Sequence, residues 1–426
     1  MSGRIDSIRD VAEKHLCTGC GVCAYLAPDA LRMVDDLERG RRPFPLEGRE
    51  ALDVAGDALD ACPGRGLAHD RSRPSEEEEA ELFSEWGPVR ELWEGFAADD
   101  ALRLAGSSGG AASALALFAL ERAGFHGLLH IAARPDVPYL NHTVLSTSRD
   151  EILAATGSRY APASPCDGLE RIERAPAPCV FIGKPCDVAG ARAAARLRPA
   201  LAENLGLTIG IFCAGTPSTA GTLAMLRAMG FEDPAQVTGV RYRGNGWPGL
   251  ATVRAADGRE NAITYAESWG DILQVHRQWR CYVCADHTGE FADIAVGDPW
   301  YREIPPDEPG RSLILARTER GARFLAEAIA AGYLQVERVG PEILRASQPN
   351  LETTRGAIWG RIWGTRLLGA AAPRYRNVAI FPSWWSRLGA KDKLRSFLGT
   401  FKRTFKKGLR KRRPVRPWTP PDLSDS

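Results

Sequence analysis

Apolar and polar residues alternate in a regular order through the middle of the chain. The stretch Gly109–Gly124 (GGAASALALFALERAG) predicts a helix that ends at Gly124, and the apolar run in GFHGLLHIAAR (124–134) predicts a strand after it. The segment CVFIGKPCDVAGARAAARL (179–197) predicts a strand, a tight turn and a helix. Further strands are expected at LTIGIFC (207–213), ADIAVGD (292–298) and SLILART (312–318), and further helices at STAGTLAMLRAMGF (218–231) and ERGARFLAEAIAAGY (319–333). This alternation predicts an α/β fold with a largely parallel sheet.

The two ends of the chain differ from this α/β middle. Residues 1–80 form a small cysteine-bearing module, which ends in the charged run Arg71–Glu81 (RSRPSEEEEAE), a sequence typical of a solvated linker. After about Ala370 the alternation gives way to Trp-, Arg- and Pro-rich sequence and then to a basic tail, 385–426. We therefore expect an N-terminal module, an α/β core and a C-terminal tail.

The composition is that of a soluble globular protein. The 426 residues are 44% hydrophobic and 25% charged, and the longest mostly apolar run, Ala111–Leu120, is too short to span a bilayer. The opening sequence MSGRIDSIRDVAEKHLC lacks the apolar core of a signal peptide, so a cytoplasmic location is expected. Ten cysteines are too sparse for a disulfide scaffold, and in a reducing compartment patterned cysteines are expected to be metal or cluster ligands.

The charge is distributed unevenly. Residues 391–416 contain twelve Lys or Arg and one Asp, a net charge of +11, so the rest of the chain carries −9 of the total of +2. A mildly acidic body with a basic tail does not indicate a nucleic-acid binder, and none is expected as a partner. Within the tail, six apolar residues recur at helical spacing among Lys and Arg: Leu394, Phe397, Leu398, Phe401, Phe405 and Leu409. Such a helix suits peripheral contact with the inner membrane surface, although a solvated end or a docking site for an acidic partner such as ferredoxin has the same pattern.

The first cysteine set is CTGCGVC, which places Cys17, Cys20 and Cys23 at intervals of three. Ferredoxin-type 4Fe–4S sites use this run together with a fourth cysteine that is followed by proline. The next cysteine is Cys62, and Pro63 follows it, so we assign Cys62 as the fourth ligand. The alternative is a four-cysteine zinc site, but zinc sites usually pair two C-x-x-C knuckles.

The second cysteine set is dispersed. Cys281 and Cys284 form a C-x-x-C, and Cys186 and Cys213 lie at the ends of two predicted strands, where ligands gather in α/β sheets. Cys186 also opens a predicted helix, where the dipole favours a thiolate. The four thiols could hold a second 4Fe–4S cluster, or Cys186 and Cys213 could simply be small core residues.

Three further residues have no predicted ligand role. Cys166 and Cys179 are interpreted as structural, and a lone histidine such as His287 is more often merely hydrogen-bonded than catalytic.

A glycine-rich turn precedes the first predicted helix of the core. Ser107, Ser108, Gly109 and Gly110 offer small side chains and free amides at a helix N-terminus, which suits a phosphate, although an ordinary helix cap fits as well. The turn is neither a dinucleotide fingerprint nor a P-loop. Two more glycine-rich turns, 157–160 and 241–249, are each interpreted singly as surface loops.

Six motifs taken in order resemble the coenzyme F-420 hydrogenase/dehydrogenase beta-subunit family. They span about Gly106 to Trp300, with weaker similarity to about Ala346, and are GSSGGAASAL, TGSRYAP, FIGKPCDV, IGIFC, RYRGNGWPG and CYVCADHTGEFADIAVGD. The resemblance implies an iron–sulfur flavoprotein with an FAD-binding region at 100–178 and a 4Fe–4S region at 179–350. It implies that Cys186, Cys213, Cys281 and Cys284 hold a cluster, and that FAD binds at the SSGG turn, with Gly157, Ser158, Tyr160 and Lys184 nearby.

The N-terminal module adds a second cluster to this layout. In that respect the chain is similar to 7-hydroxymethyl chlorophyll a reductase and to ferredoxin-dependent divinyl chlorophyllide 8-vinyl reductase. Clusters carry single electrons and flavin one or two, so the main hypothesis is an oxidoreductase that passes electrons between ferredoxin and a small organic substrate. The second hypothesis is a coenzyme F-420-linked oxidoreductase or an electron-transfer subunit of a larger complex. The third is a non-enzymatic zinc protein.

Overall fold

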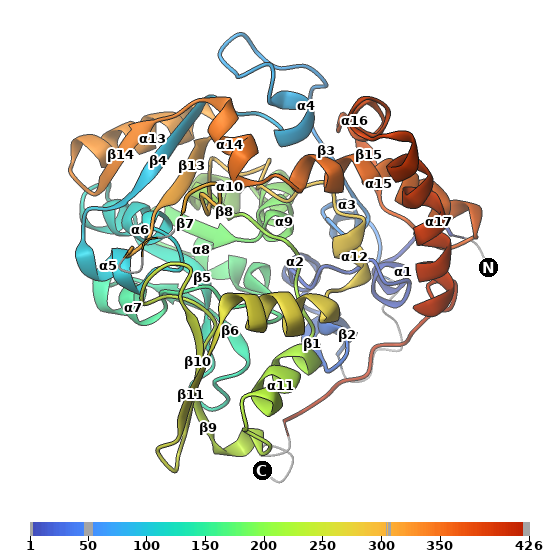
Figure 1. The fold of residues 1–426 in the computed structure, drawn as a ribbon, viewed down its shortest axis with the longest axis horizontal. Coiled ribbons are helices and arrows are strands. Elements are labelled where there is room, and N and C mark those ends of the chain that lie inside the picture. Colours follow the sequence, from blue (N-terminus) through green and yellow to red (C-terminus); the bar gives the residue numbers. More distant parts are fainter. Residues whose placement is uncertain (1–2, 47–53, 304, 306–307, 421–426) are drawn as a thin grey trace.

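The centre of the molecule is an eight-stranded sheet. The computed structural model describes residues 3–46, 54–303, 305 and 308–420 (Figure 1). The strand order of the sheet is β14-β4-β13-β12-β8-β7-β5-β6. In chain order these strands are β4 (Glu91–Ala97), β5 (Gly127–Ala133), β6 (Asn141–Ser146), β7 (Cys179–Gly183), β8 (Leu205–Ile211), β12 (Ile294–Gly297), β13 (Ser312–Ala316) and β14 (Leu334–Arg338).

The sheet confirms the α/β class and refines its pattern. The four central strands, β12, β8, β7 and β5, pair in parallel. The strands on either side of them pair antiparallel: β6 with β5, β13 with β12, and β4 with both β13 and β14. The strands predicted from continuous apolar runs form the parallel centre together with β13, which is typical of strands buried on both faces.

Helices cover both faces of the sheet. On one face α6 and α13 pack on side chains such as Val180 and Leu128, and on the other α8, α9 and α10 pack on side chains such as Phe181 and Leu129. Adjacent residues of one strand therefore serve opposite cores, as the pleat requires. The helices of this part are α5 (Asp100–Ala105), α6 (Ala111–Glu121), α7 (Arg149–Ala154), α8 (Leu169–Glu173), α9 (Pro185–Ala195), α10 (Pro199–Asn204), α13 (Glu319–Ala330) and α14 (Pro341–Ser347).

The N-terminal module has a core of its own. Its elements are α1 (Ile8–Glu13), α2 (Val22–Leu26), the hairpin of β1 (Leu31–Asp36) and β2 (Gly40–Pro45), and α3 (Asp57–Asp60). Apolar residues of these elements pack around the four cysteines of the first set. β3 (Gly66–Ala68) then pairs with β15 (Arg374–Arg376), and α4 (Phe83–Trp86) precedes the large sheet.

A smaller sheet lies beside the large one. β9 (Val237–Arg241), β10 (Leu250–Ala255) and β11 (Glu260–Thr264) form an antiparallel sheet that packs with α11 (Thr219–Ala228). A π-helix (Ala266–Ile272), a 3-10 turn (Leu273–His276) and α12 (Trp279–Tyr282) lead from it to the C-x-x-C of the second set. The alternation of apolar runs did not predict this smaller sheet.

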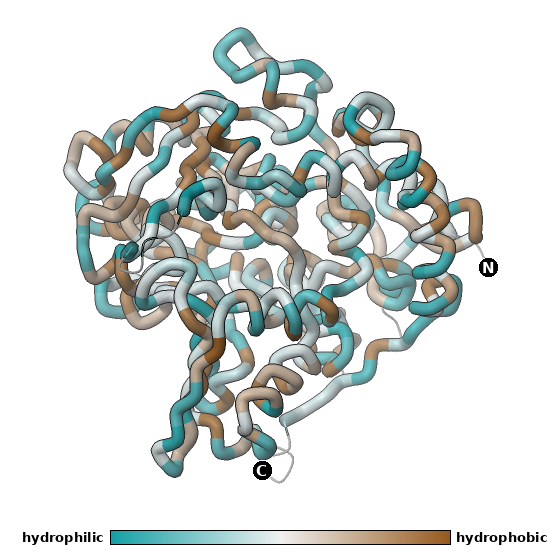
Figure 2. The backbone as a smooth tube through the Cα atoms, viewed as in Figure 1, coloured by the Kyte–Doolittle hydropathy of each residue, from teal (hydrophilic) through white to brown (hydrophobic). Residues whose placement is uncertain are grey.

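The C-terminal region is more ordered than the sequence indicated. It forms three helices, α15 (Leu351–Leu367), α16 (Ile380–Arg387) and α17 (Ala390–Lys406), which pack together at one side of the molecule (Figure 1). Figure 2, which colours the backbone by the hydropathy of each residue, shows apolar stretches along this outer side as well as in the interior.

After α17 the chain returns across the N-terminal module. In this return segment, residues 407–420, Arg413 N–H donates to Glu13 O at 2.9 Å and Trp418 N–H donates to Asp35 O at 2.8 Å. Arg39 donates to the carbonyls of Arg413 and Pro414, at 2.7 and 2.8 Å. The return segment therefore covers the module whose first residues it contacts. The structure describes 385–420 of the predicted 385–426 tail; residues 421–426 lie outside the described residues.

A buried ion network joins the module's connector, the core and α15. Glu290 accepts hydrogen bonds from Arg355 and from His69, the latter at 2.7 Å. Burial alone would raise the pKa of Glu290, but the positive charge of Arg355 and the His69 contact lower it to about 2. A carboxyl group whose pKa is lowered in the folded state stabilises the fold at pH values above its ordinary pKa. That stability is lost as the pH falls toward 2.

Glu290→Gln is expected to lower the free energy of unfolding by about 3–5 kcal/mol at neutral pH, since it leaves Arg355 buried without a counter-charge. The stability of the variant should also fall less steeply between pH 4.5 and 2 than that of wild type. Denaturant melts over this pH range test this, with the exposed Glu327→Gln as the control. Equal pH profiles for Glu290→Gln and wild type would contradict it.

Candidate functional site

A large cavity opens at the carboxyl ends of the parallel strands. Its volume is about 860 Å³, and its walls include residues directly after β7, β8 and β12. Open α/β sheets bind ligands at this edge, and the volume lies within the range of cofactor sites. Seven of the eight predicted flavin-site residues line it: Ser107, Ser108, Gly110, Gly157, Ser158, Tyr160 and Lys184.

The eighth, Gly109, lies outside the cavity lining. Its N–H donates to Ser312 Oγ at 2.8 Å, and its carbonyl accepts from Ala97 N–H at 2.7 Å. The expectation of a free amide at Gly109 is therefore wrong, because the turn is anchored there to the large sheet. Gly110 follows with φ +71°, and a Cβ atom on it would lie 2.5 Å from Leu102 O, so the start of α6 requires glycine.

The second glycine-rich turn closes against the first. Ser158 N–H donates to Ser107 Oγ, and the half-buried Tyr160 ring lies 5.0 Å from the ring of Trp269. Two turns that are 50 residues apart in sequence thus form one wall of the cavity.

Lys184 stands between the cavity and the second cysteine set. Its Nζ pairs with Asp187 at 2.6 Å. Burial would lower the pKa of Lys184, but the negative charges of Asp187 and Cys186 raise it, so the side chain is a partly buried cation at the cavity wall. The predicted place of Lys184 near the cofactor site is consistent with this geometry.

Several cavity residues had no sequence prediction. Arg243 is buried and forms a two-pronged ion pair with Asp298, at 2.8 and 3.0 Å. Its guanidinium lies 4.8 Å from the ring centre of Tyr265, which stacks on Trp300 at 5.3 Å. The loop 241–249 is therefore part of the cavity and not merely a surface loop. Its Arg and Gly content was the available signal, but only the fold brings the distant Tyr265 and Trp300 to it.

The four thiols of the first set are buried and face one another. Burial raises the pKa of Cys23 well above the usual value, and the charges of Cys17, Cys62 and Cys20 add to that rise. Burial likewise raises the pKa of Cys62 to about 12, with Cys20 and Cys17 adding to it. Gly19 N–H donates to Cys17 Sγ at 3.3 Å. Buried, mutually repelling thiolates are stable only with a cationic group among them, so this donor set fits a metal cluster.

Cys166 is a neighbour of the first set. It lies in a short 3-10 helix (Pro165–Gly168), and its N–H donates to Cys20 O at 2.9 Å. A hydrogen bond from the Cys166 thiol is the main reason that the pKa of Cys20 is lowered. Cys179 starts β7 in the core beneath it. The structural role predicted for these two remains a prediction, and Cys166 is the nearer to a ligand position.

The second set also converges. Burial raises the pKa of Cys213 to about 12, and the charges of Cys281 and Cys284 are close enough to act on it. Thr216 N–H donates to Cys281 Sγ at 3.4 Å. Cys213 and Cys281 are also part of the cavity wall. The four dispersed cysteines therefore meet beside the cavity, which their spacing alone left undecided and the family resemblance implied.

The two cysteine sets adjoin. Burial raises the pKa of Cys186 well above its usual value, and among the charges that add to the rise are those of Cys213 of its own set and Cys20 of the first set. Arg280, which is buried near Cys284 and Cys281, donates to Pro63 O at 2.8 Å, next to Cys62.

Buried polar atoms around these cysteines lack partners. Among the described residues, Arg42 Nε, Arg280 Nε and His287 Nε2 are buried without a hydrogen bond. Two of them belong to guanidinium groups, Arg42 and Arg280, whose charges act on thiols of the two sets, which suits clusters of net negative charge. His287 lines the cavity, and its Nδ1 lies 2.8 Å from Cys213 O. No group of three His, Cys, Asp or Glu side chains in the described residues is placed to hold a single metal ion.

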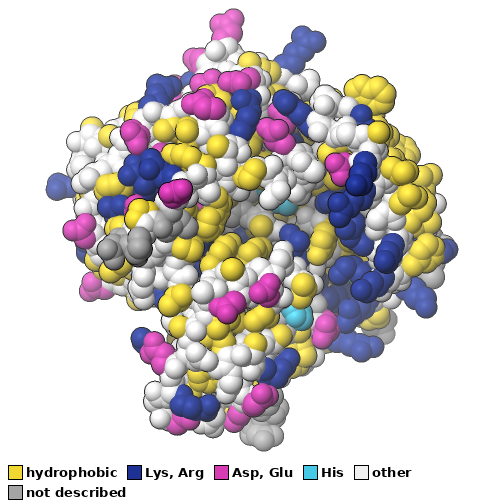
Figure 3. All heavy atoms as spheres, viewed as in Figure 1, with side chains coloured by type: hydrophobic (Ala, Val, Ile, Leu, Met, Phe, Trp, Pro, Cys, Tyr) yellow, Lys and Arg dark blue, Asp and Glu magenta, His cyan; other side chains and the backbone are white. Residues whose placement is uncertain are grey.

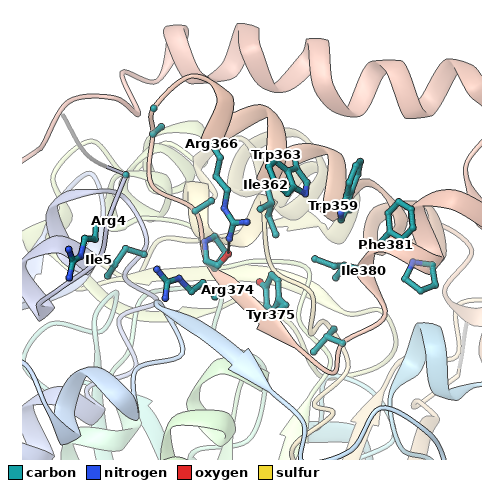
Figure 4. Close-up of a pocket in the computed structure, with 17 residues that line it drawn as sticks. Arg4, Ile5, Trp359, Ile362, Trp363, Arg366, Arg374, Tyr375, Ile380 and Phe381 are labelled. Carbon is teal, nitrogen blue, oxygen red and sulfur yellow. Dashed lines mark hydrogen bonds between the residues drawn. The ribbon is translucent and has the colours of Figure 1, made fainter.

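A second groove lies on the other side of the C-x-x-C loop. Its volume is about 820 Å³, and Figure 4 shows Trp363, Trp359 and Phe381 in a row at one end, with Arg366 and Arg374 nearer its middle. Tyr375 in its wall donates to Val283 O at 2.6 Å, within the C-x-x-C itself. This groove is separate from the cavity of the predicted flavin residues.

Two family models match the core of the chain. Residues 92–169 match the coenzyme F-420 hydrogenase/dehydrogenase beta subunit N-terminal model, and residues 178–342 match the corresponding C-terminal model. The chain belongs to this family. The family predicted from six sequence motifs is thereby confirmed. Relatives in this family are named as subunits of hydrogenases and formate dehydrogenases, and this chain is an oxidoreductase.

The relatives that match this chain share little sequence identity with it. The coenzyme F-420 hydrogenase subunit beta of Methanococcus voltae is 24% identical over 241 residues, which cover 54% of this chain and 78% of the relative. The F-420-dependent formate dehydrogenase 1 subunit beta of Methanococcus maripaludis is 24% identical over 246 residues, 58% of this chain and 61% of the relative. A ferredoxin of Thermococcus litoralis is 37% identical over 51 residues, 12% of this chain and 80% of the ferredoxin.

A solved structure shares the fold. A chain of the F-420-reducing NiFe hydrogenase complex from Methanosarcina barkeri superposes with a TM-score of 0.51 at 21% identity, covering 65% of this chain and 94% of that chain. This supports the α/β architecture and nothing more specific.

Proposed function

We propose that this protein is a coenzyme F-420-linked oxidoreductase that acts as an electron-transfer subunit. Of the two redox hypotheses from the sequence, the relatives favour this one, since four of them are beta subunits of F-420 hydrogenases or F-420-dependent formate dehydrogenases. The observation that carries the proposal is the succession of first cysteine set, second cysteine set and cavity, joined by Cys20, Cys186 and Cys213.

The residues present fit FAD and two 4Fe–4S clusters. Cys17, Cys20, Cys23 and Cys62 would hold one cluster, and the second set would hold the other. When bound, flavin exchanges electrons singly or in pairs and clusters exchange them singly, so together they join one-electron to two-electron carriers.

The chain's own groups would prepare both sites. Main-chain amides such as Gly19 and Thr216 donate to sulfur, which raises a cluster's reduction potential. Lys184 supplies a fixed positive charge between the second set and the cavity. Arg243, held by Asp298 and flanked by Tyr265 and Trp300, offers a flat cationic and aromatic surface to a ring or an anionic group.

The partner of the first set is proposed to be ferredoxin or another one-electron carrier. The match to a ferredoxin supports a segment of that type within this chain. A ferredoxin-dependent reductase of a small organic molecule remains the second candidate, because the same parts serve it. We propose a cytoplasmic location; within the described residues, no helix is long and apolar enough to cross a membrane.

The proposal is tested by mixing anaerobic, oxidised protein with reduced coenzyme F-420. Bleaching of the protein's visible absorption together with oxidation of F-420 is expected. Reduction by ferredoxin but not by F-420 would favour the organic-substrate reductase. A colourless protein that contains zinc and neither iron nor flavin would refute both.

A further inference from the structure

Helix α17 presents several of its apolar side chains outward. Leu394, Leu398 and Phe405 are 59%, 54% and 61% exposed. The residues it buries are instead small and polar, namely Ser396, Thr400 and Thr404, which follow one another at intervals of four. A surface helix of a globular protein normally buries its apolar stripe, whereas α17 half-buries Phe397 and Phe401 and leaves the other three exposed.

The inward face of α17 fits a glycine stripe on α15. Gly356, Gly360 and Gly364 recur every four residues, and a Cβ atom on Gly360 would lie 2.0 Å from Ser396 Oγ. Gly364 faces Thr400 at 3.4 Å in the same way. Such small-to-small packing lets two helices approach closely. Phe397 packs on Trp359 and Trp384, whereas Leu394, Leu398 and Phe405 are left free for another surface.

An aromatic ridge extends this outer face onto α15 and α16. Trp359 contacts Trp384 at 4.5 Å and Phe381 at 5.1 Å between ring centres. Trp363 and Trp385, at its two ends, are both exposed. The outer face therefore combines indole rings with Leu and Phe, and indole rings favour the interface between lipid and water.

Basic side chains border this face. α17 carries Lys391, Lys393, Arg395, Lys402, Arg403 and Lys406, and Asp392 is its one acidic residue. Lys393 Nζ lies 4.7 Å from the ring centre of Trp385. Arg412, which follows α17 in the return segment, forms ion pairs with Asp10 and Glu13. Figure 3 shows the Lys and Arg side chains gathered on the right, with hydrophobic side chains along the adjacent edge.

We propose that the outer face of α15, α16 and α17 docks on an anionic lipid surface, with α17 lying in the interface plane. Exposed Leu, Phe and Trp would enter the boundary between headgroups and acyl chains, and the flanking Lys and Arg would meet lipid phosphates. The positive charge complements lipid phosphate, and the apolar content exceeds what a purely ionic contact needs. The docking does not depend on FAD, clusters or coenzyme F-420.

The test is co-sedimentation of the full-length, cofactor-loaded protein with vesicles. Wild type should bind vesicles of phosphatidylcholine mixed with phosphatidylglycerol, and should bind pure phosphatidylcholine at least tenfold more weakly. The variant Leu398→Gln/Phe405→Gln should lose on the order of tenfold or more of the partition coefficient, since it removes two exposed apolar side chains that would enter the lipid. The control Leu250→Gln/Val275→Gln removes two exposed apolar side chains elsewhere and should bind like wild type.

Three results would overturn the proposal. Wild type could fail to bind anionic vesicles. Leu398→Gln/Phe405→Gln could bind them as wild type does, which would indicate an ionic contact only. Both double variants could lose binding equally, which would show that the effect is not specific to this face. Circular dichroism and iron content of each variant confirm that it is folded.

Discussion

Cys62→Ser should purify with about four irons, whereas wild type should hold about eight in two cubes. Cys62 is buried among Cys17, Cys20 and Cys23, so its loss removes the fourth thiolate of that set. Iron and acid-labile sulfide analysis with electron paramagnetic resonance should find one cluster signal missing. Reduction by ferredoxin should fall by at least a hundredfold, while flavin content stays at the wild-type level.

Two matched variants make this result specific. Cys179→Ser replaces a buried cysteine of β7 and should keep all its iron. Cys284→Ser should lose the other cluster signal and keep the first. If Cys62→Ser retains full iron while Cys166→Ser loses half, then Cys166, which adjoins Cys20, is the fourth ligand and our assignment is wrong.

Ala112→Phe should expel flavin and spare both clusters. Ala112 lies in the first turn of α6 and lines the cavity, so a phenyl ring there occupies the space of the predicted cofactor. Overpacking a site costs about 1–3 kcal/mol, which lowers affinity roughly tenfold to a hundredfold. The flavin-to-iron ratio of the purified variant measures this.

The control for this variant is Ala326→Phe, at an exposed position of helix α13, which should keep its flavin. Gly110→Val is a poorer probe, because the positive φ of Gly110 strains any side chain and would perturb α6 itself. Wild-type flavin content in Ala112→Phe would place the flavin elsewhere.

Local patterns predicted the centre of the fold well. Runs such as CVFIG and LTIGIFC became the parallel strands β7 and β8, because a strand buried on both faces must be apolar throughout. β4 and β14 escaped prediction since they alternate weakly and lie toward the sheet's edge. The helical spacing of the tail predicted α17, but α15 and α16 escaped, and the packing of α15 on α17 relies on glycine, serine and threonine, which are poor helix signals in a single sequence.

The candidate site was predictable as far as its residues lie in short motifs. CTGCGVC and the Cys-Pro pair at Cys62 are typical of a ferredoxin-type cluster site, and the structure buries all four thiols together. Arg243, Tyr265 and Trp300 could not be found in this way, because their meeting depends on where the small β9–β11 sheet folds over the cavity.

The return segment, residues 407–420, is synthesised long after the N-terminal module that it covers. Arg412 pairs with Asp10, and Arg413 and Pro414 cap Arg39, so contacts of the N-terminal module join residues made about 400 positions apart. While the ribosome is still elongating, the N-terminal module has emerged without the return segment, so we expect its cysteines to be more accessible to the cell's cluster-donating machinery. Once residues 407–420 have left the ribosome, the return segment can cover the module. Cluster loading is therefore expected to be fastest on nascent or newly released chains, and slow on protein that has already folded in iron-starved cells.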